Sequence, residues 1–241
     1  MKVISLVPSI TEAILDLGVS ETELIGRTKF CIHPQEKVKN IAIIGGTKNL
    51  NIEKIKSLKP DLIIANKEEN TKEQVEELKL HFKVLVTQVS TIEDNYYLLK
   101  NLGNIFHKEE RAQAFNLKIY EIFNKNKITT PLKVAYLIWE NPYMTVGKDT
   151  FIHHVLEEIG FQNLFKNQTR YPIINMEDLT EADVIMLSSE PFPFKDKHIE
   201  NFKKIYPKKK ILIVDGEAFS WYGTHLAKCE VYFENLIKEL Q

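Results

Sequence analysis

The stretch that decides the fold reads Ile55-Lys56-Ser57-Leu58-Lys59-Pro60-Asp61-Leu62-Ile63-Ile64-Ala65. About half a chain later the same pattern returns as Met176-Glu177-Asp178-Leu179-Thr180-Glu181-Ala182-Asp183-Val184-Ile185-Met186-Leu187. In both copies a helical segment and an acidic turn lead into an apolar run, which is typical of a parallel strand buried on both faces. A loop, a short helical segment and a second apolar run follow each copy, at 83–87 and at 210–215. The repeat therefore predicts two α/β lobes with parallel sheets and a ligand-binding cleft between them.

The pattern around the two copies predicts how the lobes are connected. A strand at 2–6 leads to a helix that Ser9 caps together with Glu12, and another helix ends at Leu102, before Gly103. Residues 108–126 read as one long helix with a single apolar stripe. We therefore expect an N-terminal α/β lobe at 1–106, a linking helix at 107–127 and a C-terminal α/β lobe at 128–241.

Composition limits the class of protein. The chain has 241 residues with 32 Lys and Arg against 33 Asp and Glu, which argues against a nucleic-acid binder. No apolar run is long enough to span a bilayer. The first strand starts next to Met1 with no leader before it, so we expect a cytoplasmic protein, or a periplasmic or cell-surface protein if the sequence was trimmed. Cys31 and Cys229 are expected to be free thiols.

Ligands of open α/β sheets bind beyond the carboxyl ends of the strands, and the loops there supply the candidate binding residues. In the first lobe these are Pro8, Ser9, Arg27, Phe30, Thr47, Lys48, Asn49 and Asn66. In the second lobe they are Trp139, Tyr143, Glu190, Phe192, Phe194, Glu217, Trp221 and Tyr222. The aromatic members could form a wall for a large flat ligand, or could pack beneath their own loops.

The sequence supports a metal site or a catalytic site less strongly than it supports ligand binding by the strand-end loops. The seven histidines show no ligand spacing, although His33 or His225 could be an axial ligand to a metal inside a macrocycle rather than an ordinary surface histidine. Glu140, Glu190, Asp215 and Glu217 could serve acid–base chemistry in an enzyme, but no serine or cysteine lies in a nucleophile elbow. A binding protein is therefore the first hypothesis, with an enzyme and a cytosolic partner or chaperone protein as alternatives.

Two motifs resemble those of a known family. Val3-Ile4-Ser5-Leu6-Val7-Pro8-Ser9-Ile10-Thr11-Glu12 and Asn51-Ile52-Glu53-Lys54-Ile55 through Leu58-Lys59-Pro60-Asp61-Leu62-Ile63 are similar to segments of cobalamin- and iron-chelate-binding proteins of ABC importers. These helical-backbone metal receptors belong to the class III periplasmic-binding-protein-like fold, in which one long helix joins two lobes.

The resemblance implies reversible, non-covalent capture of cobalamin or another corrinoid, haem or an iron siderophore between the lobes. It also implies docking on an ABC permease through one acidic residue on each lobe. Glu68 or Glu69 and Glu190 are the candidates for that contact.

Overall fold

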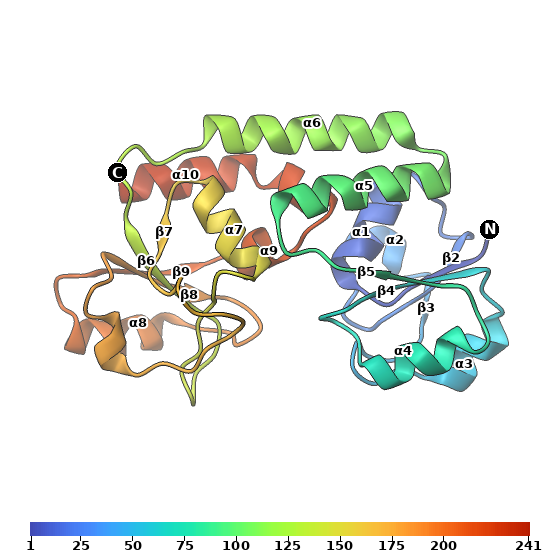
Figure 1. Ribbon diagram of the computed structural model, residues 1–241, viewed down its shortest axis with the longest axis horizontal. Coiled ribbons are helices and arrows are strands. Elements are labelled where there is room, and N and C mark those ends of the chain that lie inside the picture. Colours follow the sequence, from blue (N-terminus) through green and yellow to red (C-terminus); the bar gives the residue numbers. More distant parts are fainter. The chain divides into compact units, whose positions relative to one another are not determined.

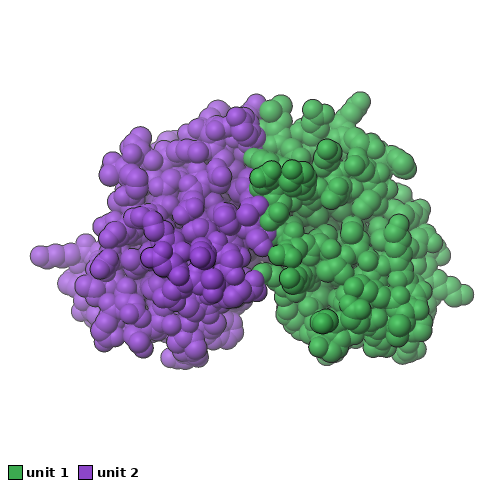
Figure 2. Space-filling model, viewed as in Figure 1, with its two compact units in different colours: residues 1–89, 93–118, 222–227 green, residues 90–92, 119–221, 228–241 purple.

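The computed structural model describes residues 1–241, which form two compact units. Unit 1 contains Met1–Val89, Glu93–Lys118 and Tyr222–Ala227, and unit 2 contains the rest of the chain (Figure 2). The long helix α6 (Glu109–Lys125) joins them, as the spacing of its apolar residues predicts. Residues 222–227 pack with unit 1, whereas the sequence-based boundaries place them in the C-terminal lobe. Those boundaries stay a prediction.

Unit 1 contains a five-stranded parallel sheet in the order β3-β2-β1-β4-β5. Its strands are β1 (Val3–Ser5), β2 (Leu24–Arg27), β3 (Ala42–Ile43), β4 (Leu62–Asn66) and β5 (Val84–Thr87). Helices α1 (Pro8–Asp16) and α5 (Ile92–Phe106) lie on one side of this sheet, and α3 (Ile52–Leu58) and α4 (Lys72–Lys79) lie on the other (Figure 1). The short helix α2 (Gln35–Val38) lies between β2 and β3 in the sequence.

Unit 2 contains a four-stranded parallel sheet in the order β7-β6-β8-β9. Its strands are β6 (Lys133–Leu137), β7 (Gln162–Asn163), β8 (Val184–Ser188) and β9 (Lys210–Val214). Helices α7 (Phe151–Glu158) and α10 (Glu230–Leu240) lie on one side of the sheet and α8 (Asp196–Ile205) on the other (Figure 1). The remaining elements are the 3-10 turns η1 (Met176–Leu179) and η2 (Thr224–Lys228) and the short helix α9 (Gly216–Ser220).

The two repeated apolar runs become the central strands that the sequence predicts. All five residues of β4 and all five of β8 are buried, and each strand is paired on both sides. Ile63 and Ala65 belong to the core of unit 1, while Ile185 and Leu187 belong to the core of unit 2. The fold is thus the two-lobe α/β arrangement with parallel sheets that the repeat indicates.

Two details of the helices differ from the prediction. Helix α1 begins at Pro8 with Val7 as its N-cap, so the expected capping role of Ser9 is wrong. Proline suits the first helical position because its missing N–H would have no partner there. Helix α5 continues past Gly103, so the predicted helix end is wrong. The glycine serves packing instead, because a Cβ at this position would lie 2.8 Å from the Cβ of Ala112 on α6.

None of the helices combines the length and the apolar character that a membrane span requires.

Candidate functional site

A single buried amide holds together three strand-end loops of unit 1. Asn70 Oδ1 accepts a hydrogen bond from the N–H of Asn66, the last residue of β4, at 2.9 Å. Its Nδ2 donates to the carbonyl oxygens of Leu6 (3.2 Å), after β1, and Thr47 (3.0 Å), after β3. Sequence reasoning missed Asn70, because its partners are 4, 23 and 64 residues away in the chain.

Two polar residues of unit 1 that were predicted to bind the ligand support these loops instead. The buried guanidinium of Arg27 donates to the carbonyl oxygens of Val38 (2.7 Å) and Thr28 (3.1 Å). The side chain of Asn66 donates to Thr87 Oγ1 at 3.2 Å and accepts from the N–H of Glu68 at 2.8 Å. Arg27 and Asn66 therefore fix the backbone on which other side chains are displayed.

Of the eight residues predicted to bind a ligand in the first lobe, three are exposed: Phe30, Lys48 and Asn49. The ring of Phe30 is 50% exposed, and the Nζ of Lys29 lies 5.0 Å from its centroid. Lys48 and Asn49 are exposed, and Lys48 Nζ donates to the carbonyl oxygen of Glu68. Pro8 is half-buried, whereas Ser9 and Thr47 are buried.

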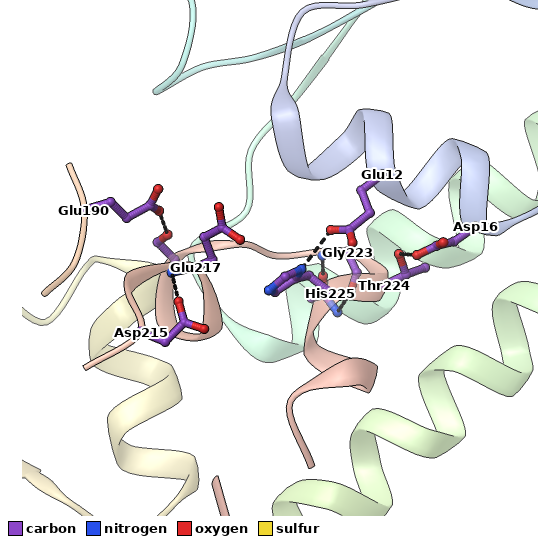
Figure 3. A network of polar contacts seen from close by, with 10 residues as sticks. Glu12, Asp16, Glu190, Asp215, Glu217, Gly223, Thr224 and His225 are labelled. Atoms are coloured by element: carbon purple, nitrogen blue, oxygen red, sulfur yellow. Dashed lines mark hydrogen bonds and ion pairs between the residues drawn. The ribbon is translucent and has the colours of Figure 1, made fainter. Parts of the chain in front are cut away.

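The segment Tyr222–Ala227 is bound to α1 and α5 by polar contacts that the sequence did not indicate (Figure 3). His225 Nδ1 lies 2.9 Å from Oε2 of the buried Glu12, and Thr224 Oγ1 donates to Asp16 Oδ2 at 2.6 Å. The N–H of Gly223 donates to Asn95 Oδ1. The rings of His225 and His33, the two candidate axial ligands, lie 6.1 Å apart. The Glu12 carboxylate, which α1 buries, is thereby satisfied by a histidine from the far end of the chain.

The predicted aromatic wall is divided between exposed and buried rings. Trp139 is 40% exposed, and Phe192 and Tyr143 are half-buried. Phe194, Trp221 and Tyr222 are buried, so they pack beneath their loops. Trp139 lies 5.8 Å from Phe192 in an edge-to-face arrangement, and both follow the carboxyl ends of neighbouring strands, β6 and β8.

Three carboxylates, those of Glu190, Asp215 and Glu217, follow the carboxyl ends of β8 and β9 in unit 2 (Figure 3). Glu190 Oε1 accepts a hydrogen bond from Ser220 Oγ at 2.7 Å. Burial raises the pKa of Glu190 above its usual value; the Ser220 hydrogen bond opposes this rise, and the charge of Glu217 adds to it. Asp215 caps α9, because its Oδ1 accepts from the N–H of Glu217 at 3.0 Å.

Neither a disulfide nor a preformed ion site occurs among the 241 residues. Cys31 and Cys229 are both buried free thiols, as expected. No three side chains of His, Cys, Asp or Glu are grouped so that they could hold a metal ion.

Residues 3–204 match the family model described as periplasmic binding protein. The chain belongs to this family. Its members are substrate-binding proteins of transport systems and not enzymes.

Individual relatives agree with this assignment. The vitamin B12-binding protein of Pectobacterium atrosepticum is 28% identical over 189 residues, which cover 74% of this chain and 67% of that protein. The crystal structure of the periplasmic vitamin B12-binding protein BtuF of Vibrio cholerae has a TM-score of 0.81 at 19% identity, covering 98% of this chain and 96% of BtuF. The periplasmic haem-binding protein HutB of Vibrio cholerae has a TM-score of 0.82 at 21% identity, covering 98% of both chains. At these identities the two structures establish the fold alone.

Proposed function

We propose that this receptor reversibly binds a metal chelate with a large conjugated ring, either a corrinoid or a haem, and delivers it to an ABC permease. The observation that carries the proposal is the family match together with relatives whose names specify vitamin B12 or haem. The ligand is held without a covalent bond. We also propose that the protein works outside the cytoplasm, since the structural relatives are described as periplasmic; the expectation of a cytoplasmic location has no support in the comparisons.

Within each unit, we propose contacts from members of the predicted set that are exposed or half-buried. In unit 1 they are Phe30, Lys48 and Asn49, and in unit 2 they are Trp139, Phe192 and Glu190. Aromatic rings that reach the surface can stack on the apolar face of a corrin or porphyrin, and the polar groups can bind its carboxylate or amide substituents. The cleft predicted between the two lobes stays a prediction.

The test is a titration of the purified protein with cyanocobalamin and with haemin, followed by visible absorbance and calorimetry. We expect one chelate per chain with a dissociation constant of about 1 µM or lower. Trp139→Ala should weaken binding, whereas Tyr120→Ala, which removes an exposed ring of α6, should not. If neither cyanocobalamin nor haemin binds, the proposed function is wrong.

Docking on a permease through Glu68 or Glu69 and Glu190 is part of the same proposal. Burial raises the pKa of Glu69, which Lys48 partly opposes, and the pKa of Glu190 is also raised. Charge reversal at Glu68 should reduce transport by the reconstituted importer and leave ligand affinity unchanged. A variant that transports normally would remove Glu68 from the docking surface.

A further inference from the structure

His198 lies in the first turn of α8 and is the most enclosed histidine near the strand-end loops of unit 2. Its side chain is 3% exposed. Nδ1 accepts a hydrogen bond from the N–H of Lys195, the N-cap of α8, at 2.7 Å. Nδ1 also lies 3.0 Å from the carbonyl oxygen of Lys195, so both polar backbone groups of the N-cap residue meet this nitrogen. The buried Nε2 has no hydrogen-bond partner within the protein, and Glu140 Oε2 lies 3.5 Å away.

The same imidazole ring supports two aromatic side chains. Its centroid lies 5.6 Å from Phe192 and 5.3 Å from Phe194, and both contacts are edge-to-face. Phe192 in turn contacts the exposed ring of Trp139. We call Trp139, Phe192, Phe194 and His198 the aromatic row. It runs from the buried start of α8 to the exposed loop that follows β6.

His198 thus contacts that exposed loop by two routes. One route passes through the ring of Phe192 to Trp139, and the other passes from Nε2 to the carboxylate of Glu140, the residue next to Trp139. Glu140 is 22% exposed, so its carboxylate reaches a buried ring nitrogen from a partly solvated position. Burying a ring nitrogen that makes no hydrogen bond has a cost that a phenylalanine at this position would avoid. What histidine adds is the polar contact to Glu140, 3.5 Å from Nε2.

We propose that His198 is a positioning residue that holds Trp139 in the orientation in which its indole ring receives one face of the ligand's conjugated ring. The ligand part of this inference rests on the proposed function. His198 does not touch the ligand itself; it acts through Phe192 and Glu140. An indole fixed before binding loses less rotational freedom when the ligand arrives, which favours tight binding.

The experiment uses the full chain with both tryptophans labelled as 5-fluorotryptophan. The sequence contains only Trp139 and Trp221, so the ¹⁹F spectrum has two signals, and Trp139→Phe assigns them. In His198→Ala we expect the Trp139 signal to move toward the position of a solvated indole and the Trp221 signal to stay in place. The affinity for haemin or cyanocobalamin, whichever the unaltered protein binds, should fall about fivefold or more.

Two further variants separate positioning from a general loss of stability. His198→Phe keeps a ring against Phe192 and should restore most of the Trp139 signal, while Glu140 loses its buried partner. Leu156→Ala opens a cavity in α7, on the other side of the sheet, and should lower stability while leaving the Trp139 signal and the affinity unchanged.

An unchanged Trp139 signal in His198→Ala would overturn the positioning role. A His198→Phe variant that behaves like His198→Ala would overturn the route through the ring of Phe192. If neither chelate binds the unaltered protein, the proposed function fails, while the ¹⁹F signals still decide whether His198 orients Trp139.

Discussion

Replacing Gly223 by alanine should release the segment 222–227 from unit 1. The φ angle of Gly223 is +92°, a backbone conformation that side chains with a Cβ rarely adopt. Left-handed backbone costs an alanine about 1–2 kcal/mol. The new Cβ would also lie 3.1 Å from Ala13 Cβ and 3.2 Å from the carbonyl oxygen of Ser9, both of which are fixed within α1. Overpacking of this kind costs about 1–3 kcal/mol, so the total loss in the free energy of unfolding should be about 2–5 kcal/mol.

The chain offers a matched control at Gly18, whose φ angle is +90°. A Cβ at Gly18 would meet the Nη1 of Arg111 at 3.1 Å, the end of a flexible side chain that can move aside. Gly18→Ala should therefore lose only the backbone contribution of about 1–2 kcal/mol. The difference between the two variants measures the packing of residues 222–227 against α1.

The assay is urea unfolding followed by circular dichroism, together with hydrogen exchange of residues 222–227. We expect faster exchange in this segment for Gly223→Ala and not for Gly18→Ala, because the hydrogen bond from the Gly223 N–H to Asn95 should be lost only in the first. Equal destabilisation of the two variants, with the segment still protected in both, would refute the reasoning.

Three other predictions concern single side chains. Asn70→Ala removes three hydrogen bonds and should lower the free energy of unfolding by about 2–4 kcal/mol, whereas exposed Asn49→Ala should change it by less than about 0.5 kcal/mol; equal urea midpoints would contradict this. The pKa of Glu190 is raised in the folded protein above its usual value of 4.5. The protonated side chain therefore stabilises the folded protein at low pH, and this stabilisation is lost as the pH rises from 4.5 through the raised pKa. The melting temperature of Glu190→Gln, relative to that of the unaltered protein, should therefore increase as the pH is raised from 4 to 7. A difference that does not change with pH would contradict a raised pKa for Glu190. Burial raises the pKa of the Cys31 thiol, so in a Cys229→Ser variant Ellman's reagent at pH 8 should react slowly until urea unfolds the chain; rapid reaction of the folded protein would show that the thiol is accessible.

Local sequence pattern determined the elements of this protein and their order. The apolar runs of β4 and β8 predicted buried parallel strands because a strand enclosed on both faces needs apolar side chains at every position, which neighbouring residues alone reveal. The stripe of α6 predicted the connecting helix for a similar reason, since helical periodicity is a local property. The opening motif and the Leu58-Lys59-Pro60-Asp61 turn were sufficient to suggest the family to which the chain belongs.

The roles of individual side chains were decided only by tertiary structure. The sequence placed Arg27 and Asn66 at strand ends but could not show that they turn inward to backbone and side-chain partners. It gave no sign that His225 meets Glu12, because the two residues are 213 positions apart. Whether an aromatic ring such as Trp139 is displayed, or one such as Phe194 is buried, depends on which distant segments pack over it, and packing is a property of the folded chain.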